Sequence, residues 1–286
     1  MIKNLPIPLT SPLTPAQQTT LINLVRRTAK AEILPRFRNL AAAEIATKSS
    51  PFDLVTEADT EAEAMLTRGL QKMFPHALVV GEEAASTDDG LRHKIGEAEL
   101  AFIVDPLDGT WNFANGLPLF GVIVAVTRFG KPVLGLLYDP VMDDWIIADE
   151  AHPTRFARTS RADRRLHVSR GGALGEMSGF VHLYLMARGH RAEMAAALPD
   201  FARTQVLRCS CHEYRTLARG GMDFCLSGVM NPWDHAAGVL ICQQAGGHVA
   251  MLDGRAYNAS FTEGFLLAAP DRDSWMRLRD RFAFLL

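Results

Sequence analysis

The chain has 286 residues, of which 48% are hydrophobic and 22% charged. This composition is typical of a globular protein with a sizeable core, and it excludes intrinsic disorder and a disulfide-stapled mini-protein. The 30 Lys and Arg residues nearly balance the 32 Asp and Glu residues, for a net charge of −2. Net charge therefore indicates no nucleic-acid or membrane partner, and the length predicts one large domain or two medium-sized ones.

Targeting signals and cysteine usage both favour a soluble cytoplasmic protein. Met1–Thr14 has no basic region followed by an apolar one, as an export signal would. The longest apolar stretch, Leu117–Val126, is far shorter than the ~20 residues that cross a bilayer. The cysteines form no C-x-x-C pair or zinc-like spacing with histidine, so we predict reduced thiols. They are Cys209, Cys211, Cys225 and Cys242.

The first half of the chain predicts two helices followed by a series of strands. Thr14 and Pro15 predict the start of a helix that runs towards Pro35. A second helix is predicted over Glu57–Phe74, where apolar residues at spacings of three and four form one stripe. Strands are predicted over Ala77–Gly81, Ala101–Val104, Gly121–Arg128, Val133–Tyr138 and Asp144–Ala148, with a polar loop over Ala84–Glu99.

The arginine-rich stretch Thr154–Arg170 has few core residues, so we predict a loop there at the seam between two domains, 1–168 and 169–286. Beyond it, strand-like and helix-like segments alternate. Helices are predicted around His212–Gly220 and from about Asp234 to Gly246-Gly247, a helix C-terminus signal. Alternating helices and strands predict a mixed α/β layered fold.

Acidic residues stand in three places where a strand ends or a helix begins. They are Gly81-Glu82-Glu83, Asp105-Pro-Leu-Asp-Gly-Thr110 and Pro232-Trp-Asp234. In the middle segment Pro106 fixes φ and Gly109 permits a conformation that other residues resist, so this turn can direct both aspartates to one side. Taken singly, such a turn is usually solvated, paired glutamates usually lie on the surface, and an aspartate at a helix start is usually an N-cap. Their joint occurrence favours a site.

Converging acids of this kind require cations. Two carboxylates about 4 Å apart repel by roughly 4 kcal/mol at an effective dielectric constant near 20. No His or Cys accompanies these motifs, and all-oxygen ligand sets suit Mg²⁺, Ca²⁺ or Mn²⁺ rather than zinc. If Gly109 and Thr110 open a short helix, their N–H groups offer a phosphate-binding site.

Four blocks of the sequence resemble the inositol monophosphatase family of metal-dependent phosphatases and span about residues 48–247. They are Lys48-Ser-Ser-Pro-Phe-Asp-Leu-Val-Thr-Glu-Ala-Asp59, Gly81-Glu-Glu83, Asp105-Pro-Leu-Asp-Gly-Thr-Trp-Asn-Phe113, and Trp233-Asp-His-Ala-Ala-Gly238 with Ala245-Gly-Gly247. The third block is highly specific to the family. The resemblance implies a five-layer αβαβα sandwich of the inositol monophosphatase and fructose-bisphosphatase type. It also implies hydrolysis of phosphomonoesters with Mg²⁺, for which Mn²⁺ can substitute.

The resemblance also implies the metal ligands. Glu82, Asp105 and the carbonyl oxygen of Leu107 would hold a first ion, and Asp105, Asp108 and Asp234 a second. Glu82 would help to bind a third, loosely held ion. One ion lowers the pKa of a bound water, and the other stabilises the leaving oxygen.

Further roles are implied for residues around these ligands. Asp59 would accept a hydrogen bond from Thr110, and Thr110 with Glu82 would orient and deprotonate the attacking water. The N–H groups of Gly109 and Thr110 would hold phosphate oxygens, and Lys48 would lie beside the site. No covalent nucleophile is required, because phosphoryl transfer depends mostly on positioning and charge neutralisation.

Two departures from the family pattern lie where the alcohol would be recognised. Members acting on inositol phosphates commonly carry a glutamate seven residues before the W-D aspartate, and this chain has Ser227 there. A G-[ST]-A stretch is replaced by Arg208-Cys-Ser-Cys-His212. We predict phosphate hydrolysis with Lys48, Ser210, Ser227 and His235 as candidate substrate contacts. For His235, a surface histidine at a helix start is the favoured alternative.

Three other features have both a functional and an ordinary interpretation. Cys209 and Cys211 could be thiolates at a helix start, although buried thiols are favoured. His182, His212 and His235 are not ligand candidates on spacing. The arginines of the predicted loop could recruit an anionic substrate or RNA, and a solvated basic loop is favoured. They are Arg155, Arg158, Arg161, Arg164, Arg165 and Arg170.

We therefore predict a Mg²⁺-dependent phosphomonoesterase acting on a small phosphorylated alcohol that resembles inositol monophosphate. Histidinol-phosphate phosphatase, nucleotide 3′-phosphatase and fructose-bisphosphatase are alternatives on the same blueprint, and an RNA- or protein-binding regulatory role is another. The resemblance implies two or three Mg²⁺ per site, lithium inhibition and a homodimer. We expect no membrane partner and no nucleic-acid partner.

Overall fold

The computed structural model describes residues 11–41, 44–48, 54–88, 90–159 and 161–286. Its helices are α1 (Pro15–Thr28), α2 (Glu57–Met73), α3 (Glu82–Thr87), α4 (Gly90–Lys94), α5 (Thr110–Ala114), α6 (Arg188–Ala197), α7 (Ser210–Ala218), α8 (Pro232–Gln244) and α9 (Arg272–Arg281). Its strands are β1 (Ile45–Thr47), β2 (Leu54–Thr56), β3 (Leu78–Gly81), β4 (Ala101–Asp108), β5 (Gly121–Arg128), β6 (Lys131–Asp139), β7 (Asp144–Asp149), β8 (His152–Arg158), β9 (Arg164–Arg165), β10 (Ser178–Val181), β11 (Arg203–Gln205), β12 (Phe224–Ser227), β13 (His248–Met251) and β14 (Leu266–Ala269).

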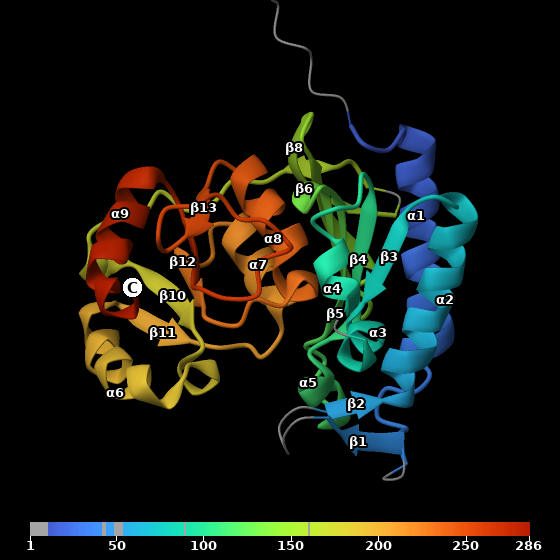
Figure 1. Ribbon diagram of the computed structural model, residues 1–286, viewed down its shortest axis with the longest axis horizontal. Coiled ribbons are helices and arrows are strands. Elements are labelled where there is room, and N and C mark those ends of the chain that lie inside the picture. The colour runs from blue at the N-terminus through green and yellow to red at the C-terminus, as the bar shows by residue number, and fades with distance from the viewer. Residues whose placement is uncertain (1–10, 42–43, 49–53, 89, 160) are drawn as a thin grey trace, which may run out of the picture.

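Helices and sheets alternate in five layers, which confirms the predicted αβαβα fold (Figure 1). Helices α1 and α2 cover one face of a seven-stranded sheet, and α7 and α8 lie between that sheet and a five-stranded one. Helices α6 and α9 cover the outer face of the five-stranded sheet. Because α8 contacts apolar side chains on both sides, it is apolar almost all round, as a fully buried helix must be.

The seven-stranded sheet has the order β3-β4-β5-β6-β7-β8-β9. Only β3 and β4 are parallel, and the other strands follow one another as an antiparallel meander. Strands β4 and β5 are buried almost throughout because helices cover both faces of the sheet. This explains their continuous apolar runs, which lack the alternation of a half-exposed strand.

The five-stranded sheet has the order β11-β10-β12-β14-β13. Strand β10 is parallel to both β11 and β12, whereas β14 is antiparallel to β12 and β13. The two sheets use residues on opposite sides of the predicted division at 168/169, with the seven-stranded sheet before it. Helices α7 and α8 nevertheless pack on the first sheet as well, and the division into two domains stays a prediction.

Several predicted elements are confirmed with small shifts. Thr14 caps α1 through a capping box with Gln17, and Pro15 is the first helical residue. The helix does not continue to Pro35 in α form, because it passes at Ala29–Ile33 into a π-helical turn. Helix α8 begins at Pro232 with Asn231 as its N-cap, so the N-cap alternative for Asp234 is wrong.

Three predictions for the segments between strands are wrong. Strand β4 continues through the whole Asp105–Asp108 motif, so the motif is the irregular end of a strand and not a turn. The polar loop predicted over Ala84–Glu99 contains parts of α3 and α4. The arginine-rich loop predicted over Thr154–Arg170 includes most of β8 and all of β9, which form an edge of the sheet.

No helix in the described ranges is both long enough and apolar enough to cross a bilayer.

Candidate active site

The centre of the candidate site is a group of three aspartates, of which Asp105 and Asp108 are buried and Asp234 is partly buried. Asp105 and Asp108 lie at the end of β4, and Asp234 is in the first turn of α8, more than a hundred residues later. One carboxylate oxygen from each lies within 4.8 Å of those of the other two. The irregular pairing between Asp105 and Asp108 in the β4–β5 ladder lets both side chains reach the same space.

Burial and mutual repulsion disfavour the charged forms of these aspartates. Burial, followed by the charges of Glu82, Asp108 and Asp234, raises the pKa of Asp105. Burial raises the pKa of Asp108 to about 6, and burial with Asp108 and Glu82 raises the pKa of Asp234. Within the described residues no Lys or Arg forms an ion pair with any of the three.

This arrangement fits a divalent cation of the magnesium type. The donor atoms are all carboxylate oxygens, which Mg²⁺ prefers, and their uncompensated charge is what such an ion would neutralise. The carbonyl oxygen of Leu107 is also a predicted ligand. It accepts a hydrogen bond from the Thr110 hydroxyl.

Thr110 and Asp59 are joined as the resemblance implies. The Thr110 hydroxyl lies 2.9 Å from Asp59 Oδ1 and 3.0 Å from the Leu107 carbonyl oxygen, both of them acceptors. The other oxygen of Asp59 accepts hydrogen bonds from the Thr56 N–H and hydroxyl groups, which cap the start of α2. Burial raises the pKa of Asp59 to about 6, so near neutral pH this carboxylate is ionised and can hold the threonine hydroxyl.

Gly109 joins β4 to the short helix α5 in a left-handed conformation with φ of +91°. A Cβ atom on Gly109 would lie 2.9 Å from the Leu119 carbonyl oxygen, so the position also requires a close backbone approach. Helix α5 begins at Thr110, as the sequence predicts. Phosphate binding by the N–H groups of Gly109 and Thr110 stays a prediction.

Glu82 and Glu83 begin α3, and Lys48 pairs with both. Lys48 Nζ lies 2.9 Å from Glu82 Oε1 and 2.6 Å from Glu83 Oε1. Although burial opposes its charge, the two glutamates raise the pKa of Lys48. Burial, with the neighbouring Glu82, raises the pKa of Glu83 to about 7. Lys48 therefore neutralises part of the negative charge beside the aspartates. Residues 49–53, which belong to the same sequence block as Lys48, lie outside the described residues.

The residue that positions this pair of glutamates was not predicted from the sequence. Glu63 is buried on α2, and its two carboxylate oxygens accept the N–H groups of Glu83 and Ala84 at 2.7 and 2.8 Å. A Cβ atom on Gly81 would lie 2.1 Å from the Glu63 carboxyl carbon, which explains the glycine. A signal exists, since Glu63 follows Asp59 by four residues on a predicted helix and so shares its face.

The first turn of α7 holds Asp108. Its carboxylate accepts hydrogen bonds from the Cys209 thiol at 3.0 Å and from the N–H groups of Ser210 and Cys211. Ser210 therefore reaches the site through its backbone. Burial raises the pKa of both thiols well above the ordinary value, so the interpretation of Cys209 and Cys211 as reactive thiolates is wrong.

Two predicted substrate contacts have other partners. His235 is 4% exposed, so its interpretation as a surface histidine is wrong. One ring nitrogen contacts the Val229 carbonyl oxygen at 2.7 Å and the other the Tyr214 hydroxyl at 3.0 Å. Burial lowers the pKa of His235 to about 4. The Ser227 hydroxyl is engaged with the backbone of Val229, so neither residue is kept as a substrate contact.

The segment that replaces the family's G-[ST]-A stretch is tied to α5. The Asn112 side chain donates hydrogen bonds to the carbonyl oxygens of Leu119 and Leu207. The Arg208 guanidinium carbon lies 4.1 Å from the centroid of the Trp111 ring.

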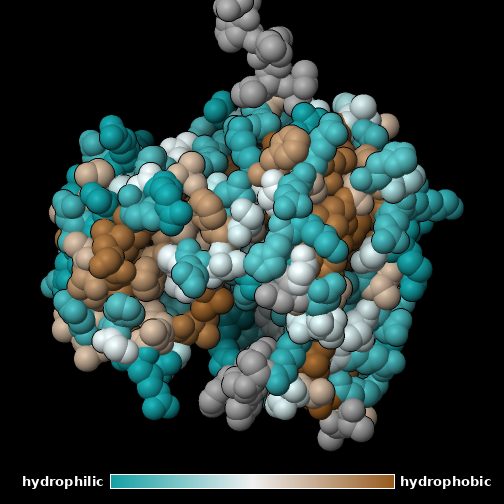
Figure 2. Space-filling view, viewed as in Figure 1, coloured by the Kyte–Doolittle hydropathy of each residue, from teal (hydrophilic) through white to brown (hydrophobic). Residues whose placement is uncertain are grey.

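The surface is hollowed between the half with the seven-stranded sheet and the half with the five-stranded sheet (Figure 2).

Comparison with known proteins agrees with this geometry. The sequence pattern of the inositol monophosphatase family matches residues 16–278. A fructose-1,6-bisphosphatase/inositol-1-monophosphatase of Thermotoga maritima is 31% identical over 216 residues, covering 76% of this chain and 78% of its own. A histidinol-phosphatase of Streptomyces coelicolor is 29% identical over 244 residues, covering 82% and 86%.

Solved structures show the same fold. An inositol monophosphatase from Zymomonas mobilis matches with a TM-score of 0.75 at 23% identity, over 95% of this chain and 100% of that chain. Fold, acidic centre and sequence relatives therefore agree, and the chain belongs to the inositol monophosphatase family.

Proposed function

We propose that the protein is a Mg²⁺-dependent phosphomonoesterase that releases phosphate from a small phosphorylated alcohol resembling inositol monophosphate. The observation that carries this proposal is the convergence of three carboxylates, two of them buried and one partly buried, without a basic partner among the described residues. Bound Mg²⁺ would neutralise phosphate charge and lower the pKa of a coordinated water. Asp105, Asp108, Asp234, Glu82 and the Leu107 carbonyl oxygen would hold two or three such ions, and Mn²⁺ could replace them.

The chain's own residues would position the attacking water. With the Thr110 proton donated to Asp59, the lone pairs of the hydroxyl are free to accept a hydrogen bond from that water. Asp59 is anchored by two hydrogen bonds from Thr56 and so keeps the hydroxyl in one orientation. Water deprotonation by Thr110 with Glu82 is part of this proposal.

Replacing Thr110 with valine is expected to lower kcat by about 10²-fold, the lower end of the range for lost general acid–base assistance. Valine keeps the shape but removes the hydroxyl group that contacts Asp59. Steady-state phosphate release with saturating Mg²⁺ measures the effect. Thr110→Ser is the matched control and should retain most of the activity, because it keeps the hydroxyl. Equal activity of the valine and serine variants would exclude a role for the hydroxyl.

The alcohol is best identified with a substrate panel, because the related proteins differ in substrate. Relatives named for fructose-1,6-bisphosphate, inositol monophosphate and histidinol phosphate are all about 30% identical to this chain. We expect inositol monophosphate or a sugar phosphate to give the highest kcat/KM, measured as phosphate release in Mg²⁺. A preference for histidinol phosphate, a nucleotide 3′-phosphate or fructose bisphosphate would select an alternative. No release from any ester would contradict the proposal.

Metal-free protein is expected to lose stability as the pH rises from about 4 through 6. The pKa values of Asp59 and Asp108 are about 6 in the folded protein against 3.8 ordinarily. The folded chain therefore holds protons that the unfolded chain has released, and its free energy of unfolding falls with rising pH in this window. Thermal denaturation in a chelator at pH 4.5, near the lower end of the window, and at pH 8, above it, measures the effect.

Mg²⁺ at 100 times its Kd should restore about 2.7 kcal/mol at the higher pH. Asp234→Asn is the comparison variant and should respond less to the ion, since it lacks one of the proposed ligands. A melting temperature at pH 8 that is independent of Mg²⁺ would argue against the metal site.

The RNA-binding alternative stays a prediction; of its six arginines, Arg155 lies on β8 and pairs with Asp163 at 2.9 Å. The homodimer, lithium inhibition and cytoplasmic location implied by the family stay predictions.

A further inference from the structure

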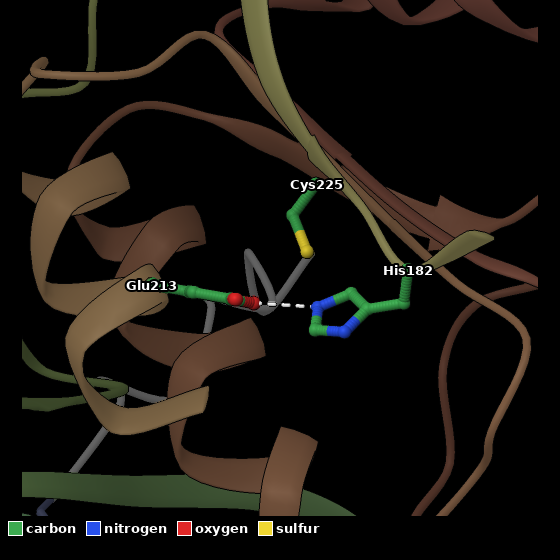
Figure 3. A group of neighbouring side chains, drawn as sticks. All are labelled: His182, Glu213 and Cys225. Atoms are coloured by element: carbon green, nitrogen blue, oxygen red, sulfur yellow. Dashed lines mark hydrogen bonds and ion pairs between the residues drawn. The ribbon is translucent and has the colours of Figure 1, made fainter. Parts of the chain in front are cut away.

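A second group of ligand-type side chains lies in the other half of the molecule. His182 follows β10, Glu213 lies on α7 and Cys225 lies on β12 (Figure 3). One donor atom from each lies within 4.8 Å of those of the other two. His182 Nε2 and Glu213 Oε2 are 2.7 Å apart, and the Cys225 sulfur points towards the same space.

Two of these three side chains have a polar atom without a hydrogen-bond partner among the described residues. Glu213 is 1% exposed, and its second oxygen accepts the Leu207 N–H at 2.8 Å, which fixes the carboxylate. Within the described ranges, neither the Cys225 thiol nor the second ring nitrogen of His182 has a hydrogen-bond partner. The buried Glu213 carboxylate, the His182 imidazole and the free Cys225 thiol therefore face one another. The thiol and one imidazole nitrogen can each still form a bond.

We propose that His182, Glu213 and Cys225 form a binding site for a divalent ion of the zinc class, distinct from the acidic centre. A nitrogen, an oxygen and a sulfur donor suit Zn²⁺ or Co²⁺, whereas Mg²⁺ prefers oxygen ligands only. Tetrahedral zinc with ligand bonds of ~2.0–2.2 Å needs its nitrogen and oxygen ligands about 3.3 Å apart. The distance between His182 Nε2 and Glu213 Oε2 is 2.7 Å, so the two atoms have only to move slightly apart to bind the same ion.

Three protein ligands leave a fourth coordination position, as in zinc sites that bind water or a small ligand. The His182 side chain is 13% exposed, compared with 2% for Glu213, so the imidazole lies on the accessible side of the group. Binding would release the Cys225 thiol proton to solvent, and the proton that joins His182 Nε2 to Glu213 Oε2 would move to the other ring nitrogen or to solvent. The affinity should therefore rise with pH.

Helix α7 connects this group to the acidic centre. The first turn that supplies the Ser210 and Cys211 N–H groups to Asp108 also carries Glu213, which in turn holds the Leu207 N–H. An ion on Glu213 would thus restrain the segment that positions Asp108. The binding of the ion does not depend on the proposed phosphatase activity, so the two proposals can fail separately.

Titration of the full chain with Co²⁺ in saturating Mg²⁺ tests the site. Co²⁺ bound to a thiolate gives a ligand-to-metal absorption band in the near ultraviolet, which an all-oxygen site lacks. We expect the band in the parent protein and in Cys242→Ser, a control that replaces another buried free thiol. The band should be lost in Cys225→Ser, and His182→Gln should weaken Co²⁺ binding at least tenfold.

Two results would overturn the proposal. One is the absence of the band in the folded parent protein. The other is its survival in Cys225→Ser, which would place the sulfur ligand elsewhere, for example at Cys209 beside Asp108. If Cys225→Ser fails to fold, His182→Gln keeps the thiol and decides the matter, with equilibrium dialysis against Zn²⁺ as a second measurement. Unchanged Zn²⁺ binding by that variant would also exclude the site.

Discussion

Asp105→Asn is expected to lower kcat/KM by at least about 10³-fold while the fold survives, a loss of about 4 kcal/mol in transition-state stabilisation. Asp105 is 2% exposed and faces Asp108, Asp234 and Glu82, whose charges all raise its pKa. Asparagine has the same shape but cannot contribute a negative charge to a divalent ion. The proposed function assigns Asp105 to both ions, so this position should be the most sensitive in the site.

The variant should fold normally, because it removes a source of repulsion. Two carboxylates about 4 Å apart repel by roughly 4 kcal/mol at an effective dielectric constant near 20. In a chelator, Asp105→Asn should therefore melt at or above the temperature of the parent protein, and it should gain less from added Mg²⁺. Asp253→Asn, an exposed position, is the control for a generic loss of charge. Near-normal turnover of a folded, Mg²⁺-loaded Asp105→Asn would contradict the proposed ligand set.

The acidic motif at the end of β4 could be recognised from the sequence because its residues are local. Asp105, Asp108 and Gly109 lie within five consecutive residues, and the left-handed φ of Gly109 is the kind of conformation that a glycine before a helix indicates. The grouping of this motif with Asp234 depended on the joint occurrence of the acidic segments and on the family resemblance. Nothing in the residues between β4 and α8 indicates that α8 begins near the point where β4 ends.

The residues that position the site could not be predicted, since their contacts join segments that are distant in sequence. Asp108 is held by N–H groups from α7, about a hundred residues away. Glu63 on α2 holds the start of α3; its spacing from Asp59 indicates the face of the helix on which it lies, but not that its carboxylate accepts backbone N–H groups of another helix. Because this contact from Glu63 could not be seen in the sequence, the segment after Glu83 was predicted as a loop.

The error at His235 has a different physical origin. A histidine near the start of a helix usually lies at the surface, and the residues of α8 alone do not indicate that a sheet packs on each side of it. Because α8 lies between two sheets, its residue His235 is buried and must find partners within the protein. His235 does so with the Val229 carbonyl oxygen and the Tyr214 hydroxyl. Because both faces of α8 are buried, His235 has a structural role where a substrate contact was predicted.

The largest expected effect on stability follows from the same layered packing. Arg215 on α7 is 4% exposed, yet its guanidinium donates hydrogen bonds to the Leu137 carbonyl oxygen at 2.9 Å and to Asp144. Asp139 lies 3.9 Å from the same group. This cluster joins α7 to β6 and β7, and α7 also supplies the N–H groups that hold Asp108.

Arg215→Met is expected to lower the free energy of unfolding by about 3–5 kcal/mol, because it leaves the buried Asp144 carboxylate without its partner. Urea denaturation measures the loss, with Arg219→Met on the next turn as a control for removing a less buried arginine. Replacing both partners, Arg215→Met with Asp144→Leu, should recover most of the stability, since no charge is then left unpaired. If the single and double variants are equally unstable, the ion pair is not what joins α7 to the sheet. Since α7 positions Asp108, the single variant should also lose turnover before it unfolds.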